Sequence, residues 1–416
     1  MQSHKTYLFL VLASLLTLIG CNGTEVEQDA HSEMQKSTKR GVSFNFTLPE
    51  DLPLLSPSCS WAYNWGNTQN SIAALWFDSN EMDFCPMAWN NSFNADQIRE
   101  YVQAHPSTKY LLGFNEPNLT DQCNMTPTQA AQYWPQVVAL AKELNLKLVS
   151  PAMNYGTLSG YSDPIKWLDE FFAIDGISLD DIDAIAIHCY MASASGLQGF
   201  VDRFEKYGKP IWMTEFCAWE NTISSVQNQM DYMSQVLNYM EQNDNIQRYA
   251  WFMPRTNGSV DSYPYMQLLT HTSPVELTDL GIIFTEFSSF DKQAWLPLAS
   301  GIPAYKYVAL SNNATTLRLD PNKVPYVYNL QAGCSIDYQV NATTTNPLKI
   351  SYATFSNCEA AIYIDDKLQG VVSLPRTGTI DVFSKVETDI TLSKGLHTLR
   401  FELQKGAICL SKVSNE

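Results

Sequence analysis

The stretch Tyr110-Leu111-Leu112-Gly113-Phe114-Asn115-Glu116-Pro117 carries the pattern that decides the fold. It begins as a short apolar run, which is typical of a buried strand in a parallel sheet. The run ends in an acidic residue, and Pro117 then stops it because proline cannot continue a strand ladder. A second run, Pro210-Ile211-Trp212-Met213-Thr214-Glu215, also ends in a glutamate. The two runs predict a parallel sheet whose strand ends carry the functional groups.

Working outward from these two runs, strand-like segments alternate with helix-like segments over residues 40–298. Repeated alternation of this kind favours a (β/α)8 TIM barrel, with a doubly wound sheet as the alternative. The eight strand-like runs are Gly41–Phe46, Cys59–Asn64, Met82–Trp89, Tyr110–Asn115, Lys147–Met153, Ile182–Tyr190, Pro210–Phe216 and Tyr249–Met253. The amphipathic candidates between them include Asn94–His105, Thr128–Leu144, Asp163–Ala173, Gly199–Tyr207 and Ser224–Gln242.

The pattern changes after Trp295, where short strand-like runs broken by turn residues replace the alternation with helices. Examples are Val324–Leu330, Leu348–Thr354, Ala360–Ile364 and Leu396–Phe401. Such spacing predicts a smaller all-β sandwich over residues 302–416. We expect the junction near Ser300–Pro303, where small residues and a proline interrupt both patterns.

The bulk composition agrees with two packed domains and narrows the class of partner. A chain of 416 residues exceeds one ordinary core, and its aromatic share of 12% suits a protein with flat apolar surfaces. The formal net charge of −17 argues against nucleic acid, which requires a basic surface. A neutral substrate fits this charge better, and we expect a monomer.

The first twenty-one residues predict export. His4 and Lys5 precede the apolar run Tyr7–Leu18, which is too short to cross a bilayer and has the build of a signal-peptide core. Leu16-Thr17-Leu18-Ile19-Gly20-Cys21 resembles the bacterial lipobox, which implies acylation at Cys21 and a lipid-anchored place in the bacterial cell envelope, at the outer membrane or cell surface. An ordinary signal peptide is the alternative. Residues 22–39 are polar and predict a flexible tether.

The remaining cysteines and histidines give no sign of a metal site. Eight cysteines follow Cys21, an even number that allows disulfides in an exported chain without selecting a pairing. Neither a C-x-x-C pair nor an H-E-x-x-H motif occurs in the sequence. We therefore expect no structural metal and no cofactor.

Glu116 and Glu215 are the candidate catalytic residues. Cleavage of a glycosidic bond needs one carboxylic acid to protonate the leaving oxygen and one carboxylate to meet the positive charge that develops on the sugar. On the predicted barrel the two glutamates follow the fourth and seventh strands, at the end where the catalytic groups of this fold lie. A single glutamate at such a place could equally be solvated or paired with an arginine such as Arg255.

Motifs at seven of the eight strands resemble those of glycoside hydrolase family 128, a clan A family. They are Ser60-Trp61-Ala62-Tyr63-Asn64-Trp65, Phe84-Cys85-Pro86-Met87-Ala88-Trp89, Gly113-Phe114-Asn115-Glu116-Pro117-Asn118, Ser150-Pro151-Ala152, Ile187-His188-Cys189-Tyr190, Met213-Thr214-Glu215-Phe216 and Tyr249-Ala250-Trp251-Phe252. The resemblance implies a retaining endo-β-1,3-glucanase with Glu116 as acid/base and Glu215 as nucleophile. It also implies that Asn115 binds the substrate 2-hydroxyl.

Further substrate contacts are expected from residues at the strand ends. Tyr190 is placed to bond the nucleophile, and His188 is either a sugar contact or a core histidine. Aromatic rings stack on the apolar faces of sugars, and we expect about half of the candidates to do so, with Trp251 the first choice. The aromatic candidates are Trp61, Tyr63, Trp65, Trp89, Tyr155, Trp219 and Trp251.

The C-terminal segment has a resemblance of its own. Leu374-Pro375-Arg376-Thr377-Gly378 and the run Ile390–Leu399 resemble the closing strands of family 6 carbohydrate-binding modules. Ile380 and Asp381 stand where many such modules have an aromatic residue, so the fold is better supported than sugar binding. Two alternatives stay open for the whole chain: a clan A glycosidase acting on another β-linked polysaccharide, and a non-catalytic surface glycan-binding lipoprotein.

Overall fold

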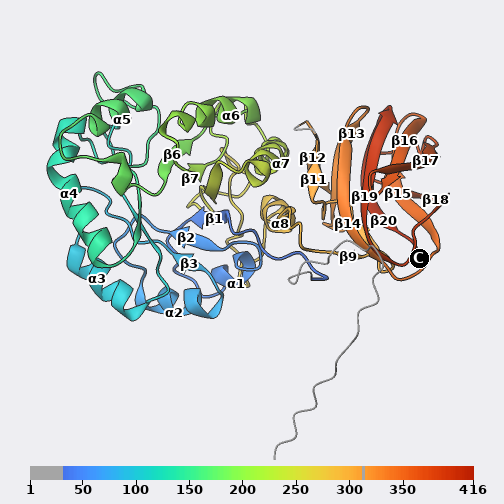
Figure 1. Cartoon of the computed structure of the whole chain (residues 1–416), viewed down its shortest axis with the longest axis horizontal. Coiled ribbons are helices and arrows are strands. Elements are labelled where there is room, and N and C mark those ends of the chain that lie inside the picture. The colour runs from blue at the N-terminus through green and yellow to red at the C-terminus, as the bar shows by residue number, and fades with distance from the viewer. Residues whose placement is uncertain (1–30, 312–313) are drawn as a thin grey trace, which may run out of the picture.

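The computed structural model of the protein describes residues 31–311 and 314–416. These residues form a barrel and a neighbouring sandwich (Figure 1). The predicted signal segment 1–21, including Cys21, and residues 22–30 of the predicted tether lie outside the described residues. None of the helices in the described part has both the length and the apolar character that a bilayer span needs.

The first domain is a ring of eight parallel strands. Six pair in the order β3-β2-β1-β8-β7-β6, and β4 pairs with β5. Parallel bridges from Met87 to Leu112 and from Val149 to Ala184 join the two sheets and close the ring. This confirms the predicted (β/α)8 barrel over the open doubly wound sheet. The strands are β1 Arg40–Ser43, β2 Trp61–Tyr63, β3 Asp83–Phe84, β4 Tyr110–Leu112, β5 Lys147–Val149, β6 Ile185–Cys189, β7 Ile211–Phe216 and β8 Ile246–Trp251.

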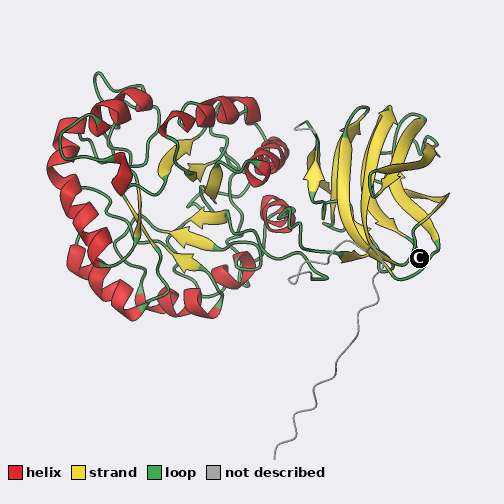
Figure 2. Ribbon diagram, in the orientation of Figure 1, coloured by secondary structure: helices red, strands yellow, loops and turns green. Residues whose placement is uncertain are grey.

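Helices surround these strands, as Figure 2 shows. Local sequence sets where they begin: Thr126 and Gln129 form a reciprocal capping box at the start of α4, and Ser225 caps α7. The α-helices are α1 Asp51–Leu55, α2 Ser71–Ser79, α3 Ala95–Ala104, α4 Pro127–Glu143, α5 Pro164–Phe172, α6 Ala194–Asp202, α7 Val226–Gln242 and α8 Asp279–Glu286. Short 3-10 turns lie at Leu179–Asp181 and Glu205–Tyr207.

The second domain consists of two mainly antiparallel sheets, which confirms the predicted sandwich. One has the order β12-β13-β20-β15-β18 with β10 on β20, and the other β11-β14-β19-β16-β17 with β9 on β14. Buried and part-exposed residues alternate along β14, as expected for a strand with one face on a core. The strands are β9 Leu296–Pro297, β10 Ile302–Pro303, β11 Ala309–Leu310, β12 Thr316–Leu319, β13 Pro325–Gln331, β14 Ser335–Ala342, β15 Pro347–Ala353, β16 Cys358–Ile364, β17 Lys367–Leu374, β18 Ser384–Thr391, β19 Gly395–Lys405 and β20 Ala407–Ser414.

The junction between the domains lies earlier than the sequence predicts. Strand β9 pairs in parallel with β14, so Leu296 already belongs to the sandwich rather than to a barrel ending at 298. The last barrel helix, α8, ends at Glu286. Because a two-residue strand shows no periodicity in the sequence, only its pairing with β14 shows that it belongs to the sandwich.

Part of the predicted tether is also packed against the protein. His31 forms a bridge with Ala294, the backbone N–H of Gln35 donates to the Asp291 carboxylate, and Ser37 is buried. Residues 31–35 therefore run along the linker between the domains, and residues 36–39 bond to the barrel. Their polar composition suggested a free segment, but their partners are likewise polar and lie far along the chain.

The sandwich docks on the outer face of α7 and α8 (Figure 1). The backbone N–H of Leu317 donates to the Ser234 hydroxyl at 3.0 Å, and Arg318 reaches Asp231 at 3.2 Å. Leu317 is buried together with the apolar side chains of both domains in one continuous core. The two domains thus share an interface and are not joined by the linker alone.

The eight cysteines after Cys21 are buried thiols, with no disulfide among the residues that the structure describes. Burial raises the pKa of several of these thiols, Cys85 to about 12 and Cys59 to about 11. The disulfides that an even cysteine count allowed are therefore not formed in this structure.

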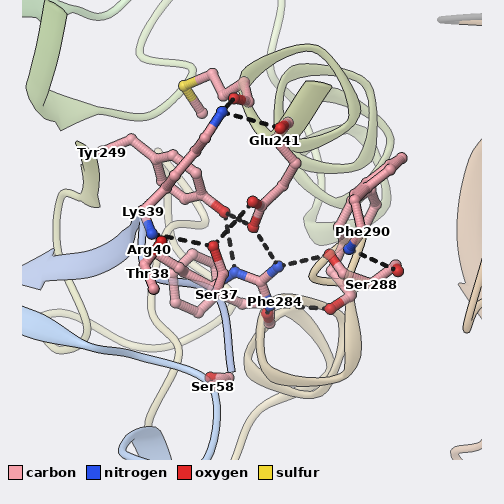
Figure 3. Close-up of polar contacts among 12 residues, drawn as sticks. Ser37, Thr38, Lys39, Arg40, Ser58, Glu241, Tyr249, Phe284, Ser288 and Phe290 are labelled. Atoms are coloured by element: carbon pink, nitrogen blue, oxygen red, sulfur yellow. Dashed lines mark hydrogen bonds and ion pairs between the residues drawn. The ribbon is translucent and has the colours of Figure 1, made fainter. Parts of the chain in front are cut away.

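A buried ionic network closes the end of the barrel opposite Glu116 and Glu215 (Figure 3). Arg40, at the start of β1, donates to the Tyr249 hydroxyl at 3.0 Å and to the Glu241 carboxylate at 2.8 Å. Glu241 also accepts hydrogen bonds from Tyr249 and Ser37. The other N–H groups of Arg40 donate to the carbonyl oxygens of Phe284, Phe287 and Ser288. The network joins β1, β8, α7 and α8.

We predict that Arg40→Met lowers the free energy of unfolding by about 3–5 kcal/mol, because it leaves the buried Glu241 charge without its partner. Denaturant titration measures the loss. The double variant Arg40→Met/Glu241→Leu should lose less than the sum of the two single variants, since neither charge remains. A loss below about 1 kcal/mol in Arg40→Met would mean that the pair behaves as a solvated surface pair.

Candidate active site

Glu116 and Glu215 lie together at the carboxyl end of the barrel. Glu116 follows β4 and Glu215 stands near the end of β7, and their side chains are 8% and 6% exposed. His188, at the end of β6 and fully buried, lies beside both. One polar atom of each of the three residues lies within 4.8 Å of the others. The barrel therefore concentrates two carboxyl groups and one imidazole in a small buried volume.

The Glu215 carboxylate is held by three neutral donors. Tyr63 and Trp65 donate to its Oε1 at 2.9 and 2.7 Å, and the Tyr190 hydroxyl donates to its Oε2. Burial, followed by the charge of Glu215, raises the pKa of both tyrosines well above the ordinary value. Both phenols therefore keep their protons at neutral pH. Together the three donors fix the orientation of the carboxylate.

Glu116 has a different environment, centred on His188. Its Oε1 accepts hydrogen bonds from His188 Nδ1 at 2.8 Å and from the Asn154 amide at 3.0 Å. Burial opposes ionisation of Glu116, but the charge and hydrogen bond of His188, with the bond from Asn154, outweigh it and lower the pKa. Burial likewise opposes the charge on His188, yet Glu215 and Glu116 raise its pKa above the usual 6.5. The two shifts favour an imidazolium at His188 beside a carboxylate at Glu116.

A cleft of about 670 Å³ opens over the two glutamates. Phe252 lies at the centre of one aromatic wall: its ring centroid is 5.9 Å from that of Trp65, 5.6 Å from Tyr190 and 5.9 Å from Trp219. Trp219 is 41% exposed, so part of this wall is open to solvent. The residues lining the cleft are Trp65, Trp89, Asn115, Glu116, Leu119, Gln122, Asn154, Tyr190, Glu215, Trp219, Phe252 and Met253.

Asn115 is oriented toward this cleft by its neighbour Gln122. Its amide Nδ2 donates to Gln122 Oε1 at 3.3 Å. Its Oδ1 is buried and has no hydrogen-bond partner among the described residues. A buried acceptor without a partner is costly, and a ligand hydroxyl would satisfy it.

Several residues predicted to touch a substrate do not reach the cleft. Trp61 and Trp251 are fully buried, and their indole N–H groups donate to the carbonyl oxygens of Lys39 and Met266. Trp251 was the first choice and is wrong as a ligand contact, because its ring packs on Phe216 and on Phe284 of α8. Successive strand residues point to opposite faces, so Phe252 faces the cleft instead of Trp251.

The other predicted contacts divide into three groups. Trp65, Trp89, Tyr190 and Trp219 line the cleft with Asn115. Tyr63 and His188 are fully buried and act on the glutamates from beneath, so neither exposes a surface for a sugar ring. Tyr155 is 47% exposed and lies outside the lining, held by Arg203 and Phe200.

Sequence reasoning missed Asn154 and Phe252. Phe252 belongs to the motif around Trp251, and strand alternation places the two residues on opposite faces without telling which face lines the cleft. Asn154 follows Ser150-Pro151-Ala152 with no local feature that marks it. Only the pairing of Asn115 with Ala152, which aligns the ends of β4 and β5, brings Asn154 to Glu116.

Glu116, His188 and Glu215 also have the spacing of a metal-binding group. His188 Nδ1, however, is engaged with Glu116 Oε1 at 2.8 Å, where one of the two atoms must carry a proton. Glu215 already accepts three hydrogen bonds. A cation would have to displace these bonds, and the donor set is better suited to carboxylates that work without one.

The chain is similar to known sugar-processing proteins over both domains. Residues 41–284 match the family model described as a glycosyl hydrolase catalytic core, and residues 304–414 match that of carbohydrate binding module family 6. A family 128 (subgroup II) endo-β-1,3-glucanase structure from Pseudomonas viridiflava is 38% identical with a TM-score of 0.55, covering 60% of this chain and 98% of that one. A second subgroup II enzyme, from Sorangium cellulosum, is 32% identical with a TM-score of 0.53, covering 59% and 97%.

A curated relative matches about half of the chain. Alkali-sensitive linkage protein 1 of Schizosaccharomyces pombe is 28% identical over 226 residues, which are 53% of this chain. The chain covers only 37% of the length of that yeast protein.

We predict that His188 titrates above pH 6.5 and that Glu116→Gln lowers its pKa, because one of the two carboxylates that favour the imidazolium is lost. The raised pKa stabilises the fold fully below the unfolded value, and this contribution disappears as the pH rises through the folded value. NMR of histidine-labelled protein measures the titration, with His188→Asn to assign the signal. A His188 that titrates below 6.5 in the unmodified protein would contradict this electrostatic account.

Proposed function

Because the chain belongs to the family of glycosyl hydrolase catalytic cores, with its barrel in glycoside hydrolase family 128, and is a glycoside hydrolase, we propose that it is a retaining endo-β-1,3-glucanase. The observation that carries the proposal is the short separation of the two glutamates. Inverting enzymes keep their carboxyl groups about 6.5–9.5 Å apart to leave room for water, and retaining enzymes about 5–5.5 Å. One oxygen of each glutamate lies within 4.8 Å of the other, and a single atom, His188 Nδ1, lies 2.8 Å from Glu116 Oε1 and 3.5 Å from Glu215 Oε2; this close approach favours the shorter, retaining separation.

In the first step Glu215 attacks the anomeric carbon while Glu116 protonates the departing glycosidic oxygen. Three fixed donors aim the Glu215 carboxylate, and the Glu116–His188 pair supplies the proton. In the second step Glu116 takes a proton from water. The water oxygen attacks the anomeric carbon, and the bond between that carbon and Glu215 breaks. The resulting sugar keeps its β configuration.

The cleft supports a neutral sugar chain as the substrate. None of the described residues that line it is lysine or arginine, so it offers no cationic partner for a uronate or sulfate group. The aromatic wall offers flat apolar surfaces to the faces of glucose rings. The β-1,3 linkage is carried over from the Pseudomonas viridiflava and Sorangium cellulosum enzymes.

We predict that Glu116→Ala loses activity on laminarin but still forms the glycosyl–enzyme from an aryl β-glucoside with a good leaving group, which needs no acid. Added azide should then restore turnover and yield a β-glycosyl azide, identified by NMR. Glu215→Gln should lose at least about a thousandfold in kcat without azide rescue, because the nucleophile is gone.

Glu220→Gln is the matched control, since Glu220 is an exposed carboxylate on the loop that follows β7, the strand of Glu215. It should keep normal activity. Recovery of an α-glycosyl azide from Glu116→Ala, or azide rescue in Glu215→Ala with retained configuration, would contradict the assignment of Glu116 as acid/base and Glu215 as nucleophile. Release of sugars from cellulose or mannan but not from laminarin would contradict the proposed specificity for the β-1,3 linkage.

We also propose that the chain is exported and held at a bacterial membrane through acylated Cys21, on the strength of the lipobox-like run Leu16–Cys21. We predict that Cys21→Ser moves the protein from the membrane fraction to the soluble fraction, because the thiol that carries the lipid is gone. Immunoblots of fractionated cells measure the shift, and Cys59→Ser, which keeps Cys21, is the control. A Cys21→Ser protein that stays in the membrane pellet after a salt wash would exclude this anchor.

A further inference from the structure

Glu116 has an unusual backbone conformation for a side chain with a Cβ. Its φ angle is 45°, in the left-handed region that glycine occupies without strain. Such a conformation persists only where the surrounding structure holds it. The contacts that hold the backbone of Glu116 therefore also decide where its carboxyl group points.

Three hydrogen bonds form a ring between the ends of β4 and β5. The backbone N–H of Glu116 donates to Ala152 O at 3.0 Å, and the Asn154 amide donates to Glu116 Oε1 at 3.0 Å. The Asn118 amide donates to the carbonyl oxygen of Asn154 at 2.7 Å. Asn118 lies only two positions after Glu116 in the chain, so the ring starts and ends on the same short segment.

Asn118 is the centre about which the loop after β5 is folded. It is fully buried, and its amide also donates to Tyr161 O at 3.3 Å, while its own carbonyl oxygen accepts from Leu158 N at 2.9 Å. Gly156 packs directly on it: a Cβ at that position would lie 2.4 Å from Asn118 O and 2.5 Å from Asn118 Nδ2. The loop closes this tightly only because residue 156 has no side chain.

We propose that Asn118 is a positioning residue for the general acid/base. It does not line the cleft and so does not contact the substrate directly. By fixing the Asn154 carbonyl it keeps the Asn154 amide on Glu116 Oε1, and with it the direction of the acid. This inference rests on the proposed function, in which Glu116 protonates the leaving oxygen.

The role has a consequence that a general loss of stability would not produce. A displaced acid slows bond cleavage in the first step for substrates whose leaving group needs a proton. The same step is largely unaffected for substrates whose leaving group departs as an anion. Asn118 should therefore affect sugar leaving groups and spare dinitrophenolate. A loosened fold would slow both substrates alike.

The test compares Asn118→Ala with the unmodified enzyme on laminarin and on a dinitrophenyl β-laminarioside. We expect kcat/KM on laminarin to fall about tenfold to a hundredfold, within the range that general acid catalysis contributes, and kcat/KM on the aryl substrate, which reports only the step that forms the glycosyl–enzyme, to change less than about threefold. In the Asn154→Ala background the same substitution should add little, because both act through one bond to Glu116.

Two further variants keep the result interpretable. Thr157→Ala is the matched control, since Thr157 binds Thr120 at 2.9 Å across the same two loops without touching Asn154, and it should behave as the unmodified enzyme on both substrates. Gly156→Ala disturbs Asn118 from the other side, by steric contact, and should reproduce the selective loss. It serves as the test in its own right where Asn118→Ala does not fold.

The outcomes separate the two proposals. Equal losses on both substrates, a full additional loss in the Asn154→Ala background, or the same selective loss in Thr157→Ala would overturn the role of Asn118. If Glu116→Ala itself lacks the leaving-group selectivity, the assignment of the acid is wrong. If the unmodified enzyme leaves laminarin uncut, the β-1,3 linkage is wrong.

Discussion

Two carboxyl groups, with one oxygen of each within 4.8 Å of the other and both almost out of contact with water, are the constraint on which the rest of the site depends. Like charges at this separation repel strongly in a protein interior, so each group needs its own compensation. Glu215 receives it from three neutral donors, and Glu116 from an imidazole and an amide. His188 lies beside both groups, so the imidazole and the fixed donors together offset the charge of the pair.

A closed barrel is well suited to this arrangement because the glutamates and their donors come from the ends of several different strands. Tyr63 ends β2, His188 lies on β6 and Glu215 on β7, while Asn154 follows β5. Strand ends converge at the mouth without the side chains having to be neighbours in sequence. The compensating groups are neutral or shared, so the cleft keeps a surface suited to an uncharged sugar.

The stabilising interactions are placed away from the mouth. The Arg40 network ties β1 and β8 to α7 and α8 at the opposite end (Figure 3), and the sandwich packs on the outer face of the same helices. Barrel folds commonly divide stability and chemistry between their two ends in this way. The strained backbone of Glu116 is then supported by the ring through Asn118 and Asn154, within a scaffold that is secured elsewhere.

The sequence by itself determined the barrel, the sandwich and the strand-end positions of Glu116 and Glu215, because an apolar run, a strand-breaking proline and a period of two are local properties of the chain. Tertiary structure alone decided that Phe252 rather than Trp251 faces the cleft, that Asn154 reaches Glu116, that residues 31–39 are packed rather than free, and that Leu296 pairs with the sandwich. Each of these depends on the face a strand presents or on partners far along the chain. A hydrogen bond or a buried face exists only when both partners are in place, and pairing between distant segments leaves no mark within either segment.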